Sequence, residues 1–290
     1  MARAGGDEHH GLVRFPLAAV ELSGDTAGMT DDRCNQFRAL HVSGTFVMPN
    51  PHDIGTTKLL TAVGFSALAT TSAGFASTLG QLDMTVTRDQ LVDHVGHLTA
   101  ASSLPFNVDS ERLYGEDAAG IAETVALLAD AGAAGCSIED WNPAEDRVDP
   151  LAVAVERVGA AAEEALRHGV VLTARCENHL HGVDDLNDTI TRLCAYRDAG
   201  AEVVYAPGLV DVAQIERVVA AVGVPVNVLL LPGGPTVAQL AAVGVRRVSL
   251  GSYFANVANA AVINAAVELQ GSGTIVAPQL DRALLRQAFA

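Results

Sequence analysis

Eight short apolar runs recur along this chain, and segments with the apolar spacing of helices lie between them. The runs are largely continuous rather than alternating, as in strands that are buried on both faces of a parallel sheet. Eight parallel strands that alternate with helices close into a (β/α)8 barrel. We therefore predict an α/β fold of the TIM-barrel type, with strands at residues 45–49, 67–72, 105–109, 135–139, 170–175, 202–206, 226–230 and 247–250.

The joints between helical segments and strands support the barrel. A glycine stands where a helical segment passes into the next strand in four of the repeating units, and glycine suits the left-handed cap of a helix there. The alternative is an open doubly wound sheet, but the phosphate-binding GxGxxG that such sheets often carry does not follow the first strand. The four glycines are Gly64, Gly132, Gly200 and Gly244.

Residues 1–29 show no sustained period and are predicted to be a flexible extension. Residues 30–290 are predicted to form one barrel domain with C-terminal helices.

Charge and composition limit the possible binding partners and the cellular compartment of the protein. The formal charge of −16 argues against nucleic acid and against anionic membrane surfaces. No apolar stretch approaches the 20 or so residues of a membrane span, and no signal-peptide core is present. The four cysteines lack paired spacing, so we expect reduced thiols in a cytoplasmic protein.

Acidic side chains follow successive strands at the end where a barrel carries its chemistry. Asp109 and Glu111 follow the third strand, Glu139 ends the fourth, and Asp83 lies in the loop after the second. Carboxylates gathered around one mouth repel one another and take up protons unless a cation neutralises them. Mg²⁺ prefers such oxygen ligands, so these four residues are the predicted metal site. The alternative for each of them is a helix cap or a surface ion pair.

Arg175, at the end of the fifth strand, suits a bidentate grip on a substrate carboxylate. A metal opposite one arginine suits a small 2-oxo acid that chelates through its carboxylate and keto oxygens, and the metal then stabilises an enolate. We predict Arg175, Glu139 and Glu111 as catalytic residues. Asn227, from the seventh strand, is a predicted substrate contact.

Four motifs taken in order resemble the isocitrate lyase/phosphoenolpyruvate mutase superfamily over roughly residues 35–270. They are TSAGFASTLG at 71–80 with Asp83 beyond it, DSERLYG at 109–115, IED at 138–140 and ARCE at 174–177. The resemblance implies a (β/α)8 barrel whose last helix is exchanged between subunits, in a homodimer or homotetramer. It also implies Mg²⁺ and 2-oxo or 2-hydroxy acid ligands, with C–C or P–C bonds made or broken.

The resemblance also implies roles for single residues. Asp109 would contact the metal directly, and Asp83, Glu111 and Glu139 would hold its waters. Arg175 would bind the substrate carboxylate. The ligand would be cradled by the hydroxyl and backbone groups of Thr71, Ser72 and Ala73.

The departures from the family pattern narrow the activity. Isocitrate and methylisocitrate lyases carry a Lys-Cys-Gly-His loop after the fourth strand, whereas residues 141–150 contain neither Cys nor His, which argues against both activities. Phosphonomutases carry a Lys in this loop and a His after the sixth strand; this loop has Asn142 but no Lys, and Pro207 stands at the His position. Arg112 and Leu113 replace a small residue and a glycine. Arg112 could neutralise the site, reach the substrate, or have the solvated or structural role that we favour.

Other signals are interpreted as structural. Lys58 is the only lysine and lies in a helix, which excludes a Schiff-base aldolase. Thr236 is expected to cap a helix, and His179 and His181 to lie in a surface loop. Trp141 is either a lid anchor or a packing residue.

Taken together, the sequence predicts an Mg²⁺-dependent lyase that acts on a small 2-oxo or 2-hydroxy acid by C–C cleavage, decarboxylation or hydrolysis. The alternatives are a catalytically silent 2-oxo acid-binding barrel and a phosphonomutase-like enzyme.

Overall fold

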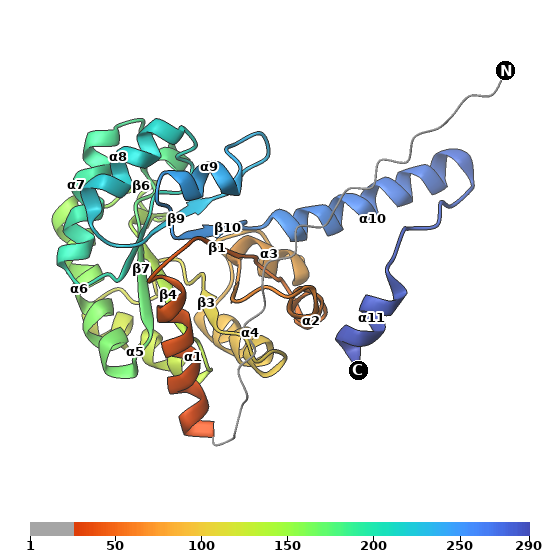
Figure 1. Ribbon diagram of the computed structural model, residues 1–290, viewed down its shortest axis with the longest axis horizontal. Coiled ribbons are helices and arrows are strands. Elements are labelled where there is room, and N and C mark those ends of the chain that lie inside the picture. The colour runs from red at the N-terminus through yellow and green to blue at the C-terminus, as the bar shows by residue number, and fades with distance from the viewer. Residues whose placement is uncertain (1–25) are drawn as a thin grey trace.

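The computed structural model describes residues 26–290 and confirms the (β/α)8 barrel (Figure 1). Residues 1–25, most of the predicted extension, lie outside the described residues. Each of the eight predicted runs contains a barrel strand, although most of the strands are shorter than the runs. The strands are β1 Phe46–Met48, β2 Leu68–Ala69, β3 Phe106–Val108, β4 Gly135–Glu139, β7 Val171–Arg175, β8 Val203–Tyr205, β9 Val226–Leu229 and β10 Arg247–Ser249.

The strands form one parallel sheet in the order β1-β10-β9-β8-β7-β4-β3-β2. Single hydrogen bonds join β1 to β2 and bring the ring close to closure. The Ala69 N–H donates to the Pro49 carbonyl at 3.0 Å, and Asn50 Nδ2 donates to the Thr70 carbonyl at 2.7 Å. Asn50 Oδ1 also accepts from the Leu250 N–H at 2.9 Å, so Asn50 links the residues that follow β2 and β10.

Helices surround the ring (Figure 1). The first begins at Thr26, so the last four residues of the predicted extension are helical. All four predicted glycine caps have left-handed φ angles, between +86° and +109°. The helices are α1 Thr26–Leu40, α2 Ile54–Val63, α3 Ser72–Thr78, α4 Arg88–Ala100, α5 Ala118–Asp130, α6 Leu151–His168, η1 Asn178–His181 (a 3₁₀ turn), α7 Leu186–Asp198, α8 Val212–Val222, α9 Val237–Ala242, α10 Tyr253–Ser272 and α11 Arg282–Phe289.

The apolar core includes the layer between the helices and the outer face of the sheet. Val125 and Leu128 of α5, Leu193 of α7 and Val218 of α8 are each at most 1% exposed. Inside the ring, by contrast, polar side chains are buried; they include Asn107, Thr173, Asn227 and Arg247. The interior beneath the mouth of the barrel is therefore polar. Each of these buried groups needs a hydrogen-bond partner, because burying an unpaired polar group is costly.

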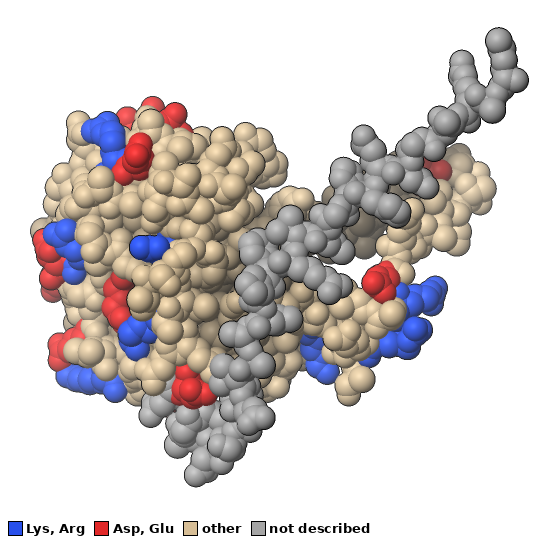
Figure 2. Space-filling model, in the orientation of Figure 1, with Lys and Arg blue, Asp and Glu red and all other residues tan. Residues whose placement is uncertain are grey.

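The C-terminal arm, α10 and α11, departs from the barrel. Helix α10 extends away from the ring, and α11 packs against α2 (Figure 1). The visible surface of α10 carries almost no charge (Figure 2), and Val262, Ile263 and Val267 are 61–70% exposed. The exchange of this helix between subunits stays a prediction. In the described part of the chain, no helix is long and apolar enough to cross a membrane.

Candidate functional site

A cavity of about 210 Å³ opens at the carboxyl ends of the strands and reaches into the ring. Its lining comes from segments far apart in sequence, which the barrel brings to one end. Glu111 and Glu139 are not part of the lining. The predicted site residues that line the cavity are Thr71, Ser72, Ala73, Asp83, Asp109, Arg175 and Asn227.

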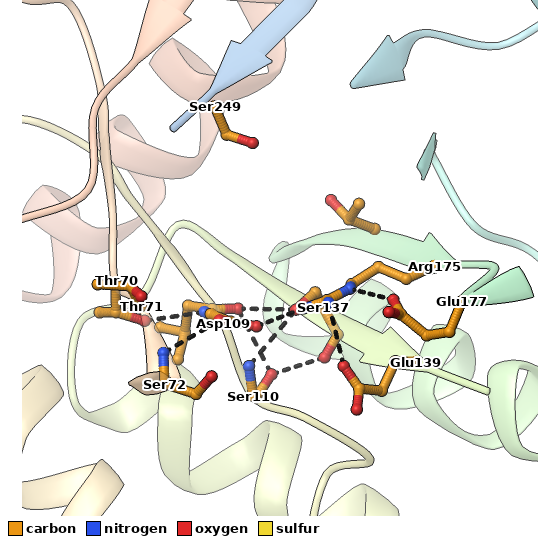
Figure 3. A network of polar contacts seen from close by, with 12 residues as sticks. Thr70, Thr71, Ser72, Asp109, Ser110, Ser137, Glu139, Arg175, Glu177 and Ser249 are labelled. Carbon is orange, nitrogen blue, oxygen red and sulfur yellow. Dashed lines mark hydrogen bonds and ion pairs between the residues drawn. The ribbon is translucent and has the colours of Figure 1, made fainter. Parts of the chain in front are cut away.

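Arg175 is the centre of an ionic cluster at the mouth (Figure 3). Its Nη1 donates to Asp109 Oδ1 at 2.6 Å, its Nε donates to Glu177 Oε1 at 2.8 Å, and its Nη2 lies 3.2 Å from Glu139 Oε2. The guanidinium carbon also lies 5.5 Å from the centre of the Tyr205 ring. The structure therefore brings Arg175 together with Asp109 after the third strand and Glu139 of the fourth, and their predicted roles toward a metal and a substrate stay predictions.

The predicted ligand cradle is partly engaged in local structure. Asp109 Oδ2 accepts from the Ser72 N–H at 3.0 Å, and the Asp109 N–H donates to Thr70 Oγ1 at 2.8 Å. The Thr71 hydroxyl accepts from the Gly74 N–H at 3.2 Å and caps α3. Thr71 and Ser72 therefore line the cavity, but the Thr71 oxygen and the Ser72 amide already have partners.

The loop after β3 is held in a strained conformation. Glu111, Leu113 and Tyr114 all have φ between +49° and +61°, which costs about 1–3 kcal/mol for each residue. Leu113 has a φ that glycine adopts more readily, and its full burial helps to hold it in this conformation. Gly115 is required by close approach, because a Cβ there would lie 2.3 Å from the Ile121 nitrogen.

The strained loop presents Glu111 as a buried acid with a free acceptor. Its Oε1 has no hydrogen-bond partner within residues 26–290. Burial and the negative charges of Asp109 and Asp83 raise the pKa of Glu111 to about 7. A carboxylate in this position needs either a proton or a nearby cation.

The acidic side chains at the mouth suit a cation that keeps most of its water ligands better than a cation bound by protein atoms alone. No group of three or more His, Cys, Asp or Glu side chains is arranged to ligate a metal directly in the described part of the chain. Mg²⁺ usually keeps several waters and takes only one or two carboxylates. The unpartnered Glu111 oxygen and the mutual repulsion of Glu111, Asp109 and Asp83 are what such an ion would relieve.

Two buried residues of the site were given no role by the sequence analysis. Glu177 has a side chain only 2% exposed and completes the cluster around Arg175, while burial raises its pKa. It belongs to the motif at residues 174–177, which was used only for the family resemblance. Arg247 lines the inner end of the cavity and is 1% exposed, but the sequence shows it only as part of an apolar strand.

The loop after β4 is fastened by Arg112. This loop is a hairpin of β5 Trp141–Asn142 and β6 Arg147–Val148, which the sequence did not predict. Arg112 Nη1 donates to Asp149 Oδ2 at 2.7 Å and to the Trp141 carbonyl at 2.9 Å. Arg112 does not line the cavity, and its bonds to the hairpin support a structural role, one of the two that we favoured.

Trp141 of the hairpin packs against residues that follow β7. The Trp141 ring stacks on the His181 ring with centroids 3.3 Å apart, which supports packing rather than a free lid anchor. The His179 side chain is only 7% exposed and lies 3.7 Å from Asp184, so it is more buried than the predicted surface loop implied. Thr236 caps α9 through a capping box, as predicted.

The family model described as phosphoenolpyruvate phosphomutase matches residues 37–270. The uncharacterized protein MT2054 of Mycobacterium tuberculosis (strain CDC 1551 / Oshkosh) is 35% identical over 219 residues, which cover 74% of this chain and 81% of that protein. The 2-methylisocitrate lyase of Escherichia coli (strain K12) is 30% identical over 182 residues, which cover 60% of this chain and 61% of that protein.

Solved structures give the same picture. A structure from Burkholderia cenocepacia J2315, classed provisionally as a lyase/mutase, has a TM-score of 0.86 and 45% identity; the match covers 91% of this chain and 98% of that one. Oxaloacetate acetylhydrolase in complex with its product oxalate has a TM-score of 0.80 and 26% identity, covering 90% of this chain and 94% of that one.

Proposed function

Because this chain belongs to the phosphoenolpyruvate phosphomutase family, we propose that it is an Mg²⁺-dependent lyase-type enzyme acting on a small 2-oxo or 2-hydroxy carboxylic acid. The reaction class is C–C cleavage, decarboxylation or hydrolysis through an enolate. One observation carries the proposal. Arg175, with Asp109, Glu139 and Glu177 around it, stands at the mouth of a cavity that suits a small acid.

The relatives support the same substrate class. The oxalate-bound neighbour is named for action on oxaloacetate, a 2-oxo acid, and the Escherichia coli relative is named for cleavage of a 2-hydroxy acid. The cavity, at about 210 Å³, is smaller than the roughly 300–1,000 Å³ that hold drug-sized ligands. A small acid therefore suits its size.

The cation would be held by Asp109 directly and by Asp83, Glu111 and Glu139 through water. When bound, Mg²⁺ supplies Lewis-acid polarisation of the substrate oxygens and neutralises charge that develops on them. The Ser72 N–H orients Asp109 by its bond to Oδ2. The Glu111 Oε1 is buried without a hydrogen-bond partner, and burial together with the charges of Asp109 and Asp83 raises the pKa of this acid to about 7.

The remaining residues bind and orient the substrate. Arg175 would exchange its bond to Asp109 Oδ1 for a substrate carboxylate, while Glu177 keeps the guanidinium in position through Nε. Glu139 and Glu111 are the proposed proton-handling acids, since both are buried and both have raised pKa values. The stacked rings of Trp141 and His181 would help to exclude water from this side of the site.

A catalytically silent acid-binding barrel is the second candidate. It is favoured by the Arg175–Asp109 bond, which occupies both the proposed carboxylate-binding residue and the proposed metal ligand. A phosphonomutase-like P–C reaction is less supported, because the loop of residues 141–150 has no Lys. Calorimetric binding measured beside turnover separates these candidates, since binding without turnover across a panel of acids supports the silent barrel.

The proposal is tested by screening 2-oxo and 2-hydroxy acids for turnover with Mg²⁺ and after chelation. Asp109→Ala is expected to lower turnover by about 10³-fold, because the direct ligand is lost. Asp93→Ala, at an exposed position on α4, is the matched control and should keep full turnover. Full activity of Asp109→Ala, or of chelated protein, would contradict the metal role.

We also propose that the protein is a homodimer or homotetramer assembled through α10. The exposed Val262, Ile263 and Val267 on this helix support an apolar interface. Val262→Glu combined with Val267→Glu should shift the mass in solution to that of a single chain, as measured by light scattering. An unchanged mass in that double variant would rule this interface out.

A further inference from the structure

Arg247 stands at the inner end of the cavity that Arg175 closes at the mouth. Register pairs run in one row across five neighbouring strands, from Glu139 to Arg175, Tyr205, Asn227 and Arg247. Side chains at directly paired positions of a parallel sheet point to the same face. Arg175 and Arg247 therefore both point into the ring, and both line the same cavity.

The hydrogen-bond partners of Arg247 are all neutral. Its Nε donates to Asn227 Oδ1 at 2.9 Å, and its Nη2 donates to Thr173 Oγ1 at 2.9 Å. Its Nη1 lies 3.4 Å from His41 Nε2. The Phe37 carbonyl accepts from His41 Nδ1, so Nε2 is the unprotonated nitrogen of a neutral imidazole. Burial and the nearby Arg247 lower the pKa of His41 to about 3, so the imidazole stays neutral.

Arg247 has no acidic counter-charge among residues 32–290, and its guanidinium carbon lies 5.9 Å from the centre of the Phe37 ring. No Asp or Glu forms an ion pair with it, although its side chain is among the largest that are fully buried. Burial lowers its pKa to about 9, which still leaves the guanidinium charged at neutral pH. A buried charge is costly unless it is paired, and Arg175 shows the usual solution with three carboxylates.

The guanidinium also keeps donors free. It has five N–H groups in a fixed fork, and its three bonds use three of them. Asn227 and Ser249, which also line the cavity, are joined by a bond of 2.9 Å from Asn227 Nδ2 to Ser249 Oγ. This fork can bind a carboxylate or a phosphate through two parallel hydrogen bonds, and a carboxylate is the anion that the proposed substrate class carries.

We propose that the inner end of the cavity is a subsite for a second carboxylate of the substrate, held by Arg247 beside Asn227 and Ser249. This inference rests on the proposed function, in which Arg175 binds the first carboxylate. It makes Arg247 the residue that selects acids with an anionic group at each end. The missing counter-charge of Arg247 is then supplied by the ligand.

The test uses acids of equal carbon number that differ only in the far group. Malate and 2-hydroxybutanoate form one pair, and 2-oxoglutarate and 2-oxopentanoate form the other. Their affinities for the full chain in Mg²⁺ are measured by calorimetry. In at least one pair, the dicarboxylate should bind about tenfold or more tightly than its partner, as expected for charged hydrogen bonds.

Arg247→Met should lower the affinity for the dicarboxylate by about tenfold or more and leave the monocarboxylate within about twofold. Arg247→Lys keeps the charge and should retain part of the preference. Arg246→Met is the matched control, because this neighbouring arginine donates to the Gly44 carbonyl outside the cavity. It should bind both acids like the unaltered protein.

A second variant guards against a folding failure of Arg247→Met. Asn227→Asp keeps the arginine and supplies a carboxylate beside it, so the preference for dicarboxylates should disappear without loss of the fold. Equal loss for both members of a pair, or no preference in the unaltered protein, would overturn the subsite and leave the proposed function standing. Absence of binding and turnover with every acid would overturn the proposed function and the subsite with it.

Discussion

The mouth of the barrel and its interior each contain a buried arginine, and the two differ in how many carboxylates surround them. At the mouth, Arg175 has Asp109, Glu139 and Glu177 within 3.2 Å. In the interior, Arg247 has an amide, a hydroxyl, an imidazole and the Phe37 ring as partners, but no acid. In the proposed function, Arg175 would exchange a protein partner for the substrate, whereas the bonds of Arg247 leave two of its five N–H groups unused. The two arginines therefore differ in the number of acids that surround them.

Arg112 is intermediate in its number of carboxylate partners, and its contacts differ from those of both other arginines. It has one carboxylate, Asp149, whose side chain is 4% exposed, and it lies outside the cavity. The pair joins the loop after β3 to the hairpin after β4. Arg112 thus has a single carboxylate partner and connects two loops outside the cavity.

The largest expected effect is that of Arg175→Ala on stability. Removing the arginine leaves three carboxylates uncompensated, and we expect a loss of about 3–5 kcal/mol in the free energy of unfolding. The measurement is urea unfolding in the presence of a chelator. Arg175→Lys, which keeps a positive charge, should lose less.

The same variant should depend on pH in a defined direction. Burial raises the pKa values of Glu139 and Glu177 above their unfolded values, and loss of Arg175 raises them further. Both acids then bind more protons in the folded state, so stability is greatest below their unfolded pKa values and falls as the pH rises through the raised ones. The deficit of Arg175→Ala should therefore be larger at pH 8 than at pH 5.5; an equal deficit would contradict the buried-acid account.

Arg112→Gln should have the next largest effect. It removes a hydrogen-bonded ion pair to a buried acid, and we expect a loss of about 1.5–3 kcal/mol. Hydrogen exchange should show faster exchange of the Trp141 and Asn142 amides, because Arg112 no longer holds the hairpin. Arg147→Gln, whose partner Glu145 is exposed, is the control and should change stability little.

Asn227→Leu tests the interior. It removes the acceptor of the Arg247 Nε–H and leaves a buried donor without a partner, for a loss of about 1–2 kcal/mol. Thermal unfolding measures this loss. Unchanged stability would mean that water replaces the amide at no cost.

Arg247→Met is expected to have the smallest effect on stability. It removes a buried charge that lacks an acid and replaces it with an apolar chain, so the change should stay within about 1 kcal/mol of zero. Urea unfolding checks this against Arg175→Ala. A loss near that of Arg175→Ala would show that Arg247 is needed for the fold and would remove the contrast between the two regions.

The barrel was predictable because its signals are local. The run of residues 135–139 matches β4 residue for residue, and the four glycine caps have the predicted left-handed φ angles. The placement of Asp109, Glu139 and Arg175 at one mouth was also predictable, because neighbouring parallel strands end at one edge, but the ion pairs between them were not. The metal roles of Asp83, Asp109, Glu111 and Glu139 stay predictions, as do the substrate roles of Thr71, Ser72, Ala73 and Asn227.

The sequence by itself determined the repeating units, the ends of the strands and hence which acids face the mouth, since apolar period and glycine caps act over a few residues. Only the tertiary structure decided which arginine has acids and which has none. Arg112 meets Asp149 across 37 positions, and Arg247 meets Thr173 across 74. Closure of the ring sets these distances, and the low-dielectric interior turns them into charge states and free donors that no local pattern records.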